Sequence, residues 1–175
     1  MIQSDLRDKD PYLRQKAEAS TFAIELLAPR KQVRRYVVGA PDLERVIEMA
    51  TAFDISKEAS ARRYVSLHSD KLAVIFSKDG RVRYVDRAIG FPWLNVRKGD
   101  LLPALPQPDG GDLPSAIEEA DPADWLDRPK GASLTAQTLH QQNGFALTLL
   151  CAEAANDGDD NGIDDTFDRF SRLTK

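Results

Sequence analysis

The hydrophobic pattern of this 175-residue chain changes its period near residue 70. Before that point, apolar residues recur three and four positions apart, as they do on one face of a helix. From Lys71 onward they form short runs that are β-branched or alternate with polar residues, as in strands. This change predicts an α+β fold, in which helices and strands occupy separate parts of the chain.

The first half predicts four helical segments. The first, residues 11–28, lies between Pro11 and Pro29 and carries an apolar stripe that has to pack against something. A short basic helix at 30–36 follows and ends before Gly39. Residues 42–53 and 56–67, the latter with Ser56 as N-cap, then predict a helix-turn-helix-like pair joined by a tight turn.

The second half predicts two pairs of strands. Residues 71–77 and 81–86, with a turn between them, predict a β-hairpin, and residues 134–139 and 145–150 predict two further strands joined at Asn143-Gly144. The intervening segment, 90–114, is rich in Gly and Pro and predicts a loop, and 115–120 and 123–126 predict short helical turns.

We therefore expect three parts: a helical part (1–68), a small α+β domain (69–155) and a flexible acidic tail (156–175). No stretch approaches the ~20 apolar residues of a membrane span, and the polar N-terminus lacks the features of a secretory signal, which predicts a cytoplasmic location. The single cysteine, Cys151, excludes a disulfide within one chain and predicts a buried, inert thiol.

Three segments carry a resemblance to a known family. The sequence "KAEASTFAIELLAP", residues 16–29, resembles the segment that follows the HExxH helix in ImmA/IrrE-type zinc peptidases, with Ser20 and Ala28 where Asn and Met are usual. Residues 43–67 are similar to the middle of such proteins, in a frame of Phe53, Ser56, Ala59 and Arg63. "QQNGFALTLL", residues 141–150, looks like a strand of the C-terminal domain, which is GAF-like in this family.

The resemblance implies a regulatory metallopeptidase that cleaves a helix-turn-helix transcriptional repressor and so switches on genes of a stress response or a mobile element. It assigns Glu18 as the third zinc ligand, beside two ligands from an HExxH helix. This chain has no HExxH, Met1 lies 17 residues before Glu18, and the two histidines, His68 and His140, are 72 residues apart. One carboxylate cannot hold a catalytic zinc, so we expect no bound metal and no peptidase activity from this chain alone.

Three explanations stay open: the chain is a truncated peptidase, one piece of a split protein whose partner supplies the HExxH helix, or a relative that has lost the chemistry. The apolar first helix favours the first two, because it ought to pack against a neighbour that the chain hardly provides. The alternative is that this helix packs against residues 42–67 as ordinary core.

Binding of a repressor or of DNA through residues 30–67 is the second functional hypothesis. The helix 56–67 would act as recognition helix, with Lys57, Arg62 and Arg63 facing phosphates or bases. The basic helix would add contacts from Arg30, Lys31, Arg34 and Arg35. The first 68 residues hold 12 Lys/Arg against 10 Asp/Glu, and the whole chain has a net charge of −4, so direct DNA binding is disfavoured against a scaffold role.

Other polar and aromatic residues give weaker signals. Asp157, Asp159, Asn161 and Asp168 match the spacing of an EF-hand calcium loop, although a solvated acidic tail explains them more simply. We expect His68 to be a cation at the end of a helix and His140 to lie on the surface of a strand. Aromatic residues at the centre of the chain predict either a ligand pocket of the GAF-like domain or a small sealed core; they are Phe91, Trp93 and Trp125.

Overall fold

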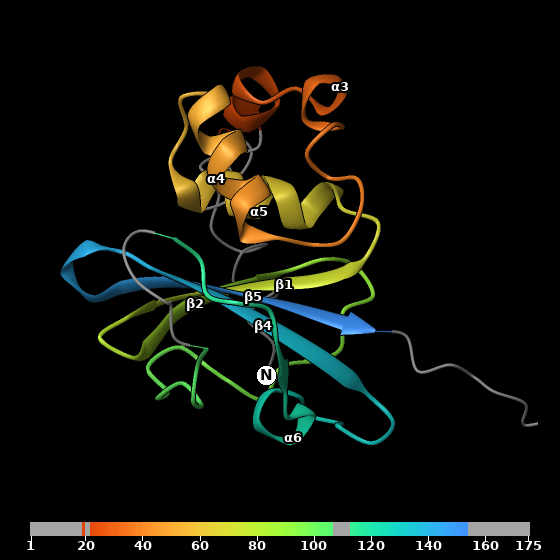
Figure 1. Ribbon diagram of the computed structural model, residues 1–175, viewed down its shortest axis with the longest axis vertical. Helices are drawn as coiled ribbons and strands as arrows, with labels where there is room; N and C mark the ends of the chain where they lie inside the picture. Colours follow the sequence, from red (N-terminus) through yellow and green to blue (C-terminus); the bar gives the residue numbers. More distant parts are fainter. Residues whose placement is uncertain (1–18, 20–21, 107–112, 154–175) are drawn as a thin grey trace, which may run out of the picture.

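The computed structural model describes residues 19, 22–106 and 113–153, so Glu18 and the acidic tail with its calcium-like spacing lie outside the described residues. The described chain is an α+β fold in which the helices of residues 22–67 cover one face of a five-stranded sheet (Figure 1). Its helices are an N-terminal helix over residues 22–27, α3 (Arg30–Val33), α4 (Leu43–Ala52), α5 (Lys57–Leu67) and α6 (Pro122–Trp125). Its strands are β1 (Lys71–Lys78), β2 (Arg81–Arg87), β3 (Glu118–Ala120), β4 (Ser133–His140) and β5 (Phe145–Glu153).

The sheet is antiparallel throughout, in the order β2-β1-β5-β4-β3. Both predicted strand pairs, β1–β2 and β4–β5, are confirmed, and their turns lie together because Asp79 N–H donates to the Gly144 carbonyl at 2.8 Å. The helical turn predicted over 115–120 is wrong. Residues 118–120 pair with β4 as an edge strand, because Ser115 is tied to Thr138 of β4 by hydrogen bonds and sets the register.

The two central helices begin close to their predicted starts, and each follows an N-cap residue, of which Ser56 is the predicted one. Asp42 accepts a hydrogen bond from Glu44 N–H at the start of α4, and Ser56 accepts one from Ala59 N–H at the start of α5. The turn between the helices passes through Asp54 in a left-handed conformation. The predicted pair of helices joined by a tight turn is therefore present as local structure.

The helices and the sheet share one hydrophobic core. α4 and α5 contribute buried side chains such as Leu43, Met49 and Tyr64, which pack against Leu72 and Phe76 on the helix-facing side of the sheet. Gln137 of β4 reinforces this contact, because its side chain accepts from Leu43 N–H at 2.7 Å and donates to the Asp42 carboxylate. The core thus crosses the boundary that the sequence places at residue 68.

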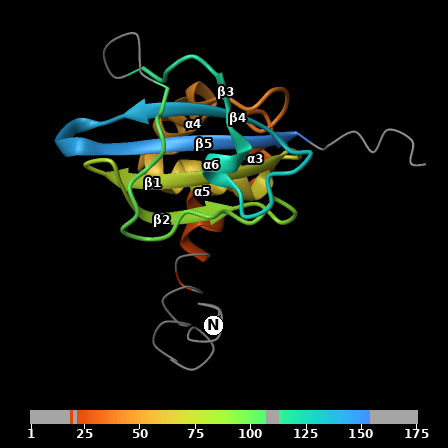
Figure 2. The same ribbon diagram turned by 90° about the horizontal axis from the view of Figure 1, so that it is seen from below.

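A second cluster covers the opposite face of the sheet. The loop 88–106 and α6 lie across that face in Figure 2, and they bury Phe91, Trp125 and Leu126 against strand residues such as Ile75 and Leu150. The loop is therefore structured by packing, although its sequence forms no regular element. None of the helices in the described ranges has the length and apolar character of a membrane span.

Candidate functional site

The N-terminal helix has one buried face and one open face. Ile24 and Ala28 pack into the core beneath the helix. Away from Ile24, Phe22 and Leu26 are four residues apart and share one side of the helix, and they are 71% and 69% exposed. Leu27, between that side and Ile24, is 54% exposed. Several large apolar side chains exposed on one short helix mark an interaction site more often than a random surface does. The sequence also allowed this helix to pack entirely in the core. In the structure, only the side that carries Ile24 does so.

A buried arginine fixes the orientation of this helix. Both terminal nitrogens of Arg63, on α5, bond the Glu25 carboxylate at 2.6 and 2.7 Å, and Arg63 Nε donates to the Ala28 carbonyl at 3.1 Å. The two bonds from Arg63, with a further contribution from Arg30, lower the pKa of the Glu25 carboxyl. The N-terminal helix is thus held by its polar side while its apolar face stays open.

Four basic residues closely follow the N-terminal helix along the chain. Arg30, Lys31, Arg34 and Arg35 belong to α3 and the turn that follows it, and all four are exposed. Figure 1 places α3 and the N-terminal helix on the side of the helical layer that faces away from the sheet. We call this set the N-terminal surface; it comprises Phe22, Leu26, Leu27, Arg30, Lys31, Arg34 and Arg35.

The other two predicted binding residues do not join this surface. Arg63 is only 6% exposed and acts as the structural tie described above. Arg62 is exposed, but it lies over the Tyr84 ring and pairs with Asp86 of β2 at 3.5 Å. The prediction that Arg63 meets a partner or DNA is therefore wrong for this arrangement of the chain.

The geometry of α5 also argues against a recognition helix. α5 packs between α4 and strands β1 and β2, and among its residues only Arg62 and Ser66 are exposed. A recognition helix has to present one free face to the major groove, with several side chains reaching base edges. α5 offers no such face, and the helix pair acts instead as a layer of the core.

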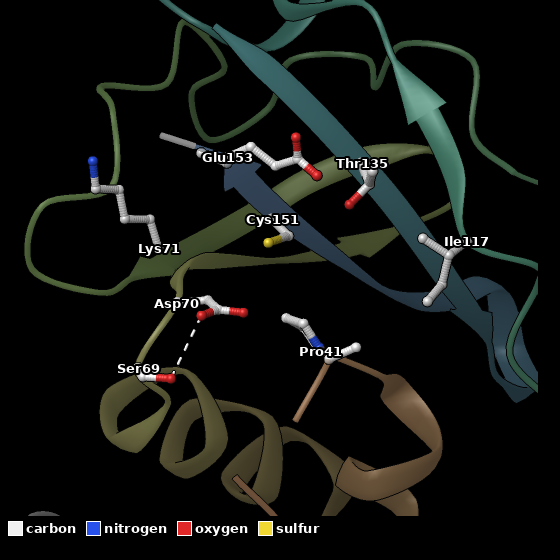
Figure 3. Close-up of a pocket in the computed structure, with 10 residues that line it drawn as sticks. Pro41, Ser69, Asp70, Lys71, Ile117, Thr135, Cys151 and Glu153 are labelled. Carbon is white, nitrogen blue, oxygen red and sulfur yellow. Dashed lines mark hydrogen bonds between the residues drawn. The ribbon is translucent and has the colours of Figure 1, made fainter. Parts of the chain in front are cut away.

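A shallow pocket opens where the helical layer meets the strand ends (Figure 3). The pocket has a volume of about 580 Å³. Five segments line it: the residues before α4, the α5–β1 connection, the residue before β3, strand β4 and the end of β5. In Figure 3, Asp70 and Pro41 lie on one side of this space and Thr135, Cys151 and Glu153 on the other. Sequence patterns do not predict this pocket, because the residues that line it are far apart along the chain.

The chemistry of the pocket is limited. Burial, followed by the nearby carboxylates of Asp70 and Glu153, raises the pKa of the Cys151 thiol to about 11. Since the thiolate is the reactive form, this cysteine is a poor nucleophile at neutral pH. The prediction of an inert thiol agrees with this setting, although the side chain is half-buried and not fully enclosed.

His68 differs from its prediction as a helix-end cation. Its side chain is buried beside Tyr64, and Nδ1 accepts a hydrogen bond from Asp70 N–H at 3.0 Å. That bond requires an unprotonated Nδ1, and burial lowers the pKa of the ring. His68 is therefore a neutral residue of the α5–β1 connection, whereas His140 lies half-buried at the end of β4.

The aromatic residues of the loop region do not form a ligand pocket. Phe91 and Trp125 are buried in the second core cluster. Trp93 lies at the surface, where the Arg87 guanidinium stacks 3.7 Å from its ring centroid. The alternative of a small sealed core thus describes Phe91 and Trp125, and the pocket in Figure 3 is lined by other residues.

Within the described ranges, no three His, Cys, Asp or Glu side chains are grouped so that they could hold a metal ion. The predicted ligand, Glu18, is outside those ranges. The N-terminal surface is consequently the feature that brings together most of the predicted site residues. Comparison of the chain with protein-family models and with curated proteins finds no match.

Proposed function

We propose that this chain is a regulatory protein of the ImmA/IrrE metallopeptidase type that acts by docking a partner protein on its N-terminal surface and has no peptidase activity by itself. The observation that carries the proposal is the open face of the N-terminal helix, with Phe22, Leu26 and Leu27 each more than half exposed. Burying one such side chain is worth about 1.5–3 kcal/mol. A partner that covers all three therefore gains a substantial hydrophobic contribution.

The family resemblance gives this partner a specific chemistry. In the helix that the sequence predicts over residues 11–28, position 18 shares a face with position 22, because residues four apart lie one above the other. A partner helix that packs on Phe22 and Leu26 would bring an HExxH motif close to Glu18, which would then complete a three-residue zinc site. The metal would activate a bound water for hydrolysis of the repressor. The basic residues Arg30, Lys31, Arg34 and Arg35 would help to dock the repressor or its DNA complex.

The test is a metal and complex analysis of the full chain. Alone, the chain should carry no stoichiometric zinc; mixed with the product of an adjacent HExxH-containing reading frame, it should form a complex with one zinc. Leu26→Asp should abolish the complex, and Glu18→Gln should abolish the zinc but keep the complex. The control is Gln32→Asp, which places the same charge at an exposed position of α3.

Two results would overturn the proposal: zinc bound by the chain alone, or a complex that Leu26→Asp leaves intact. The second candidate, a non-enzymatic regulator that binds repressor or DNA through residues 30–67, is favoured by the exposed Arg30, Lys31, Arg34 and Arg35. It predicts retarded DNA or captured repressor at low salt, lost when Arg30 and Arg34 are replaced by Ala and unaffected by Leu26→Asp.

A further inference from the structure

The C-terminal sequence is complementary to the N-terminal surface, because it carries apolar residues and opposite charges. Ile163, Phe167 and Phe170 are spaced four and three residues apart, the spacing of one apolar helical face. Acidic residues accompany that face; they are Asp157, Asp159, Asp160, Asp164, Asp165 and Asp168. This segment lies outside the described residues, so the comparison is one of sequence pattern with an observed surface.

We propose that residues 157–174 dock on the N-terminal surface of the same chain and cover it until a partner displaces them. The apolar positions 163, 167 and 170 would cover Phe22, Leu26 and Leu27, and the aspartates would face Arg30, Lys31, Arg34 and Arg35. This inference rests on the proposed function only in that both assign the same surface; it adds the regulation of that surface.

The charges favour the C-terminal segment over a second copy of the chain as the group that covers the N-terminal surface. Two copies related by a two-fold axis would bring four cations of one chain against four of the other, which is repulsive. Residues 157–174 instead carry six carboxylates and two arginines, Arg169 and Arg172, so the segment brings a net charge of −4 to the four cations. Opposite charges across an apolar contact steer association and set its register.

The length of the chain permits the contact. Residues 154–162 connect β5 to the first apolar position and can span at most about 30 Å when extended. Packed layers lie about 10 Å apart, so a linker of this length is longer than the helical layer is thick. Tethering at this length gives an effective concentration in the millimolar range, so a weak contact suffices.

The test compares backbone amide hydrogen exchange of the full-length wild type with a Phe167→Asp/Phe170→Asp variant. We expect the amides of residues 22–35 to exchange several-fold faster in the variant, because their cover is lost. The matched control is Arg172→Asp, which changes the net charge by the same amount as the double variant on the opposite side of the helical period. It should exchange like the wild type.

A second measurement uses a fluorescein-labelled synthetic peptide of residues 156–175 added to the full-length double variant. Its anisotropy should rise on binding, and raising the salt from about 50 to about 500 mM should weaken the affinity by tenfold or more. Adding Leu26→Asp to the double variant should remove the binding. The labelled peptide should also bind the wild type more weakly than the double variant, because the wild-type surface is already covered.

Three results would overturn the inference. Equal exchange in wild type and double variant means that the segment is not the cover. An exchange difference that grows with protein concentration means that a second copy's segment is the occupant. Peptide binding that survives Leu26→Asp places the contact elsewhere. A failed inference leaves the proposed function standing as long as Leu26→Asp still abolishes the partner complex, so the two failures are distinguishable.

Discussion

A single buried histidine gives the fold a pH dependence of known sign. The His68 ring makes one hydrogen bond, from Asp70 N–H, and its Nε2 has no hydrogen-bond partner in the described part of the chain. The Asp70 carboxylate, 3.9 Å from Nδ1, and the Gly39 carbonyl both favour the protonated ring. Burial is the larger effect and lowers the pKa of His68.

We expect the free energy of unfolding to fall as the pH drops below about 6.5. In that range the imidazole of His68 binds a proton in the unfolded chain but not in the folded protein, because the folded-state pKa is lower. The loss continues until the pH reaches the lowered pKa of the folded state. His68→Asn keeps an acceptor for Asp70 N–H but cannot titrate. Urea midpoints at about pH 5.5 and about pH 7.5 should therefore differ less in His68→Asn than in wild type. An equal difference in both proteins would assign the pH dependence to other groups.

The sequence could not separate the roles of neighbouring residues. Arg62 and Arg63 are both cations on a predicted helix, and each was expected to contact a partner. Only the position of residues 25–28, 35 or more positions away along the chain, decides that Arg63 is a buried tie. Likewise, the packing of α5 on β1 decides that His68 is enclosed and neutral.

At the scale of elements, the contact between the N-terminal helix and α5 depends on one side chain. Arg63 joins Glu25 and the Ala28 carbonyl across the two helices. Arg63→Met should leave that carbonyl without its donor, at a cost of about 1–3 kcal/mol in the free energy of unfolding. Amide exchange of residues 22–28 should also accelerate, because the helix is no longer held.

Urea unfolding and amide exchange of the same samples check this prediction. Arg62→Met is the matched control, because the exposed Arg62 pairs with Asp86 at the surface and its removal should change stability by less than about 0.5 kcal/mol. If the two substitutions lowered the free energy of unfolding equally, the bonds of Arg63 to Glu25 and Ala28 would contribute no more stability than an ion pair at the surface.

At the scale of the whole molecule, the shared core should make the helices and the sheet unfold together. Leu43 and Met49 of α4 contact the same cluster as Leu72 of β1. We expect one transition in urea, with coincident midpoints for helical circular dichroism and for Trp125 fluorescence in a Trp93→Phe background. Trp125 reports on the opposite face of the sheet, so coincidence means that both layers unfold as one unit.

Leu43→Ala should lower the free energy of unfolding by about 2–5 kcal/mol and move the urea midpoints of both probes together. Leu101→Ala, at a position that is 65% exposed, is the control and should shift neither probe appreciably. Separate transitions would restore the division of the chain at residue 68 that the sequence suggests.

The sequence by itself determined the order of helices and strands and most of their limits. The caps at Asp42 and Ser56 and the turn at Asn143-Gly144 act on residues only a few positions away, so they can be read locally. Residues 118–120 show the limit of such reading, because a tertiary pairing with β4 overrides their local preference.

Only the tertiary structure decided which surfaces are left for function. Periodicity shows that the N-terminal helix is apolar, but not that Ile24 is covered while Phe22 and Leu26 stay open. It also gives no sign of a pocket at Cys151, whose walls come from five separate segments. Covering a side chain requires atoms from distant parts of the chain, and their placement depends on the packing of the whole fold.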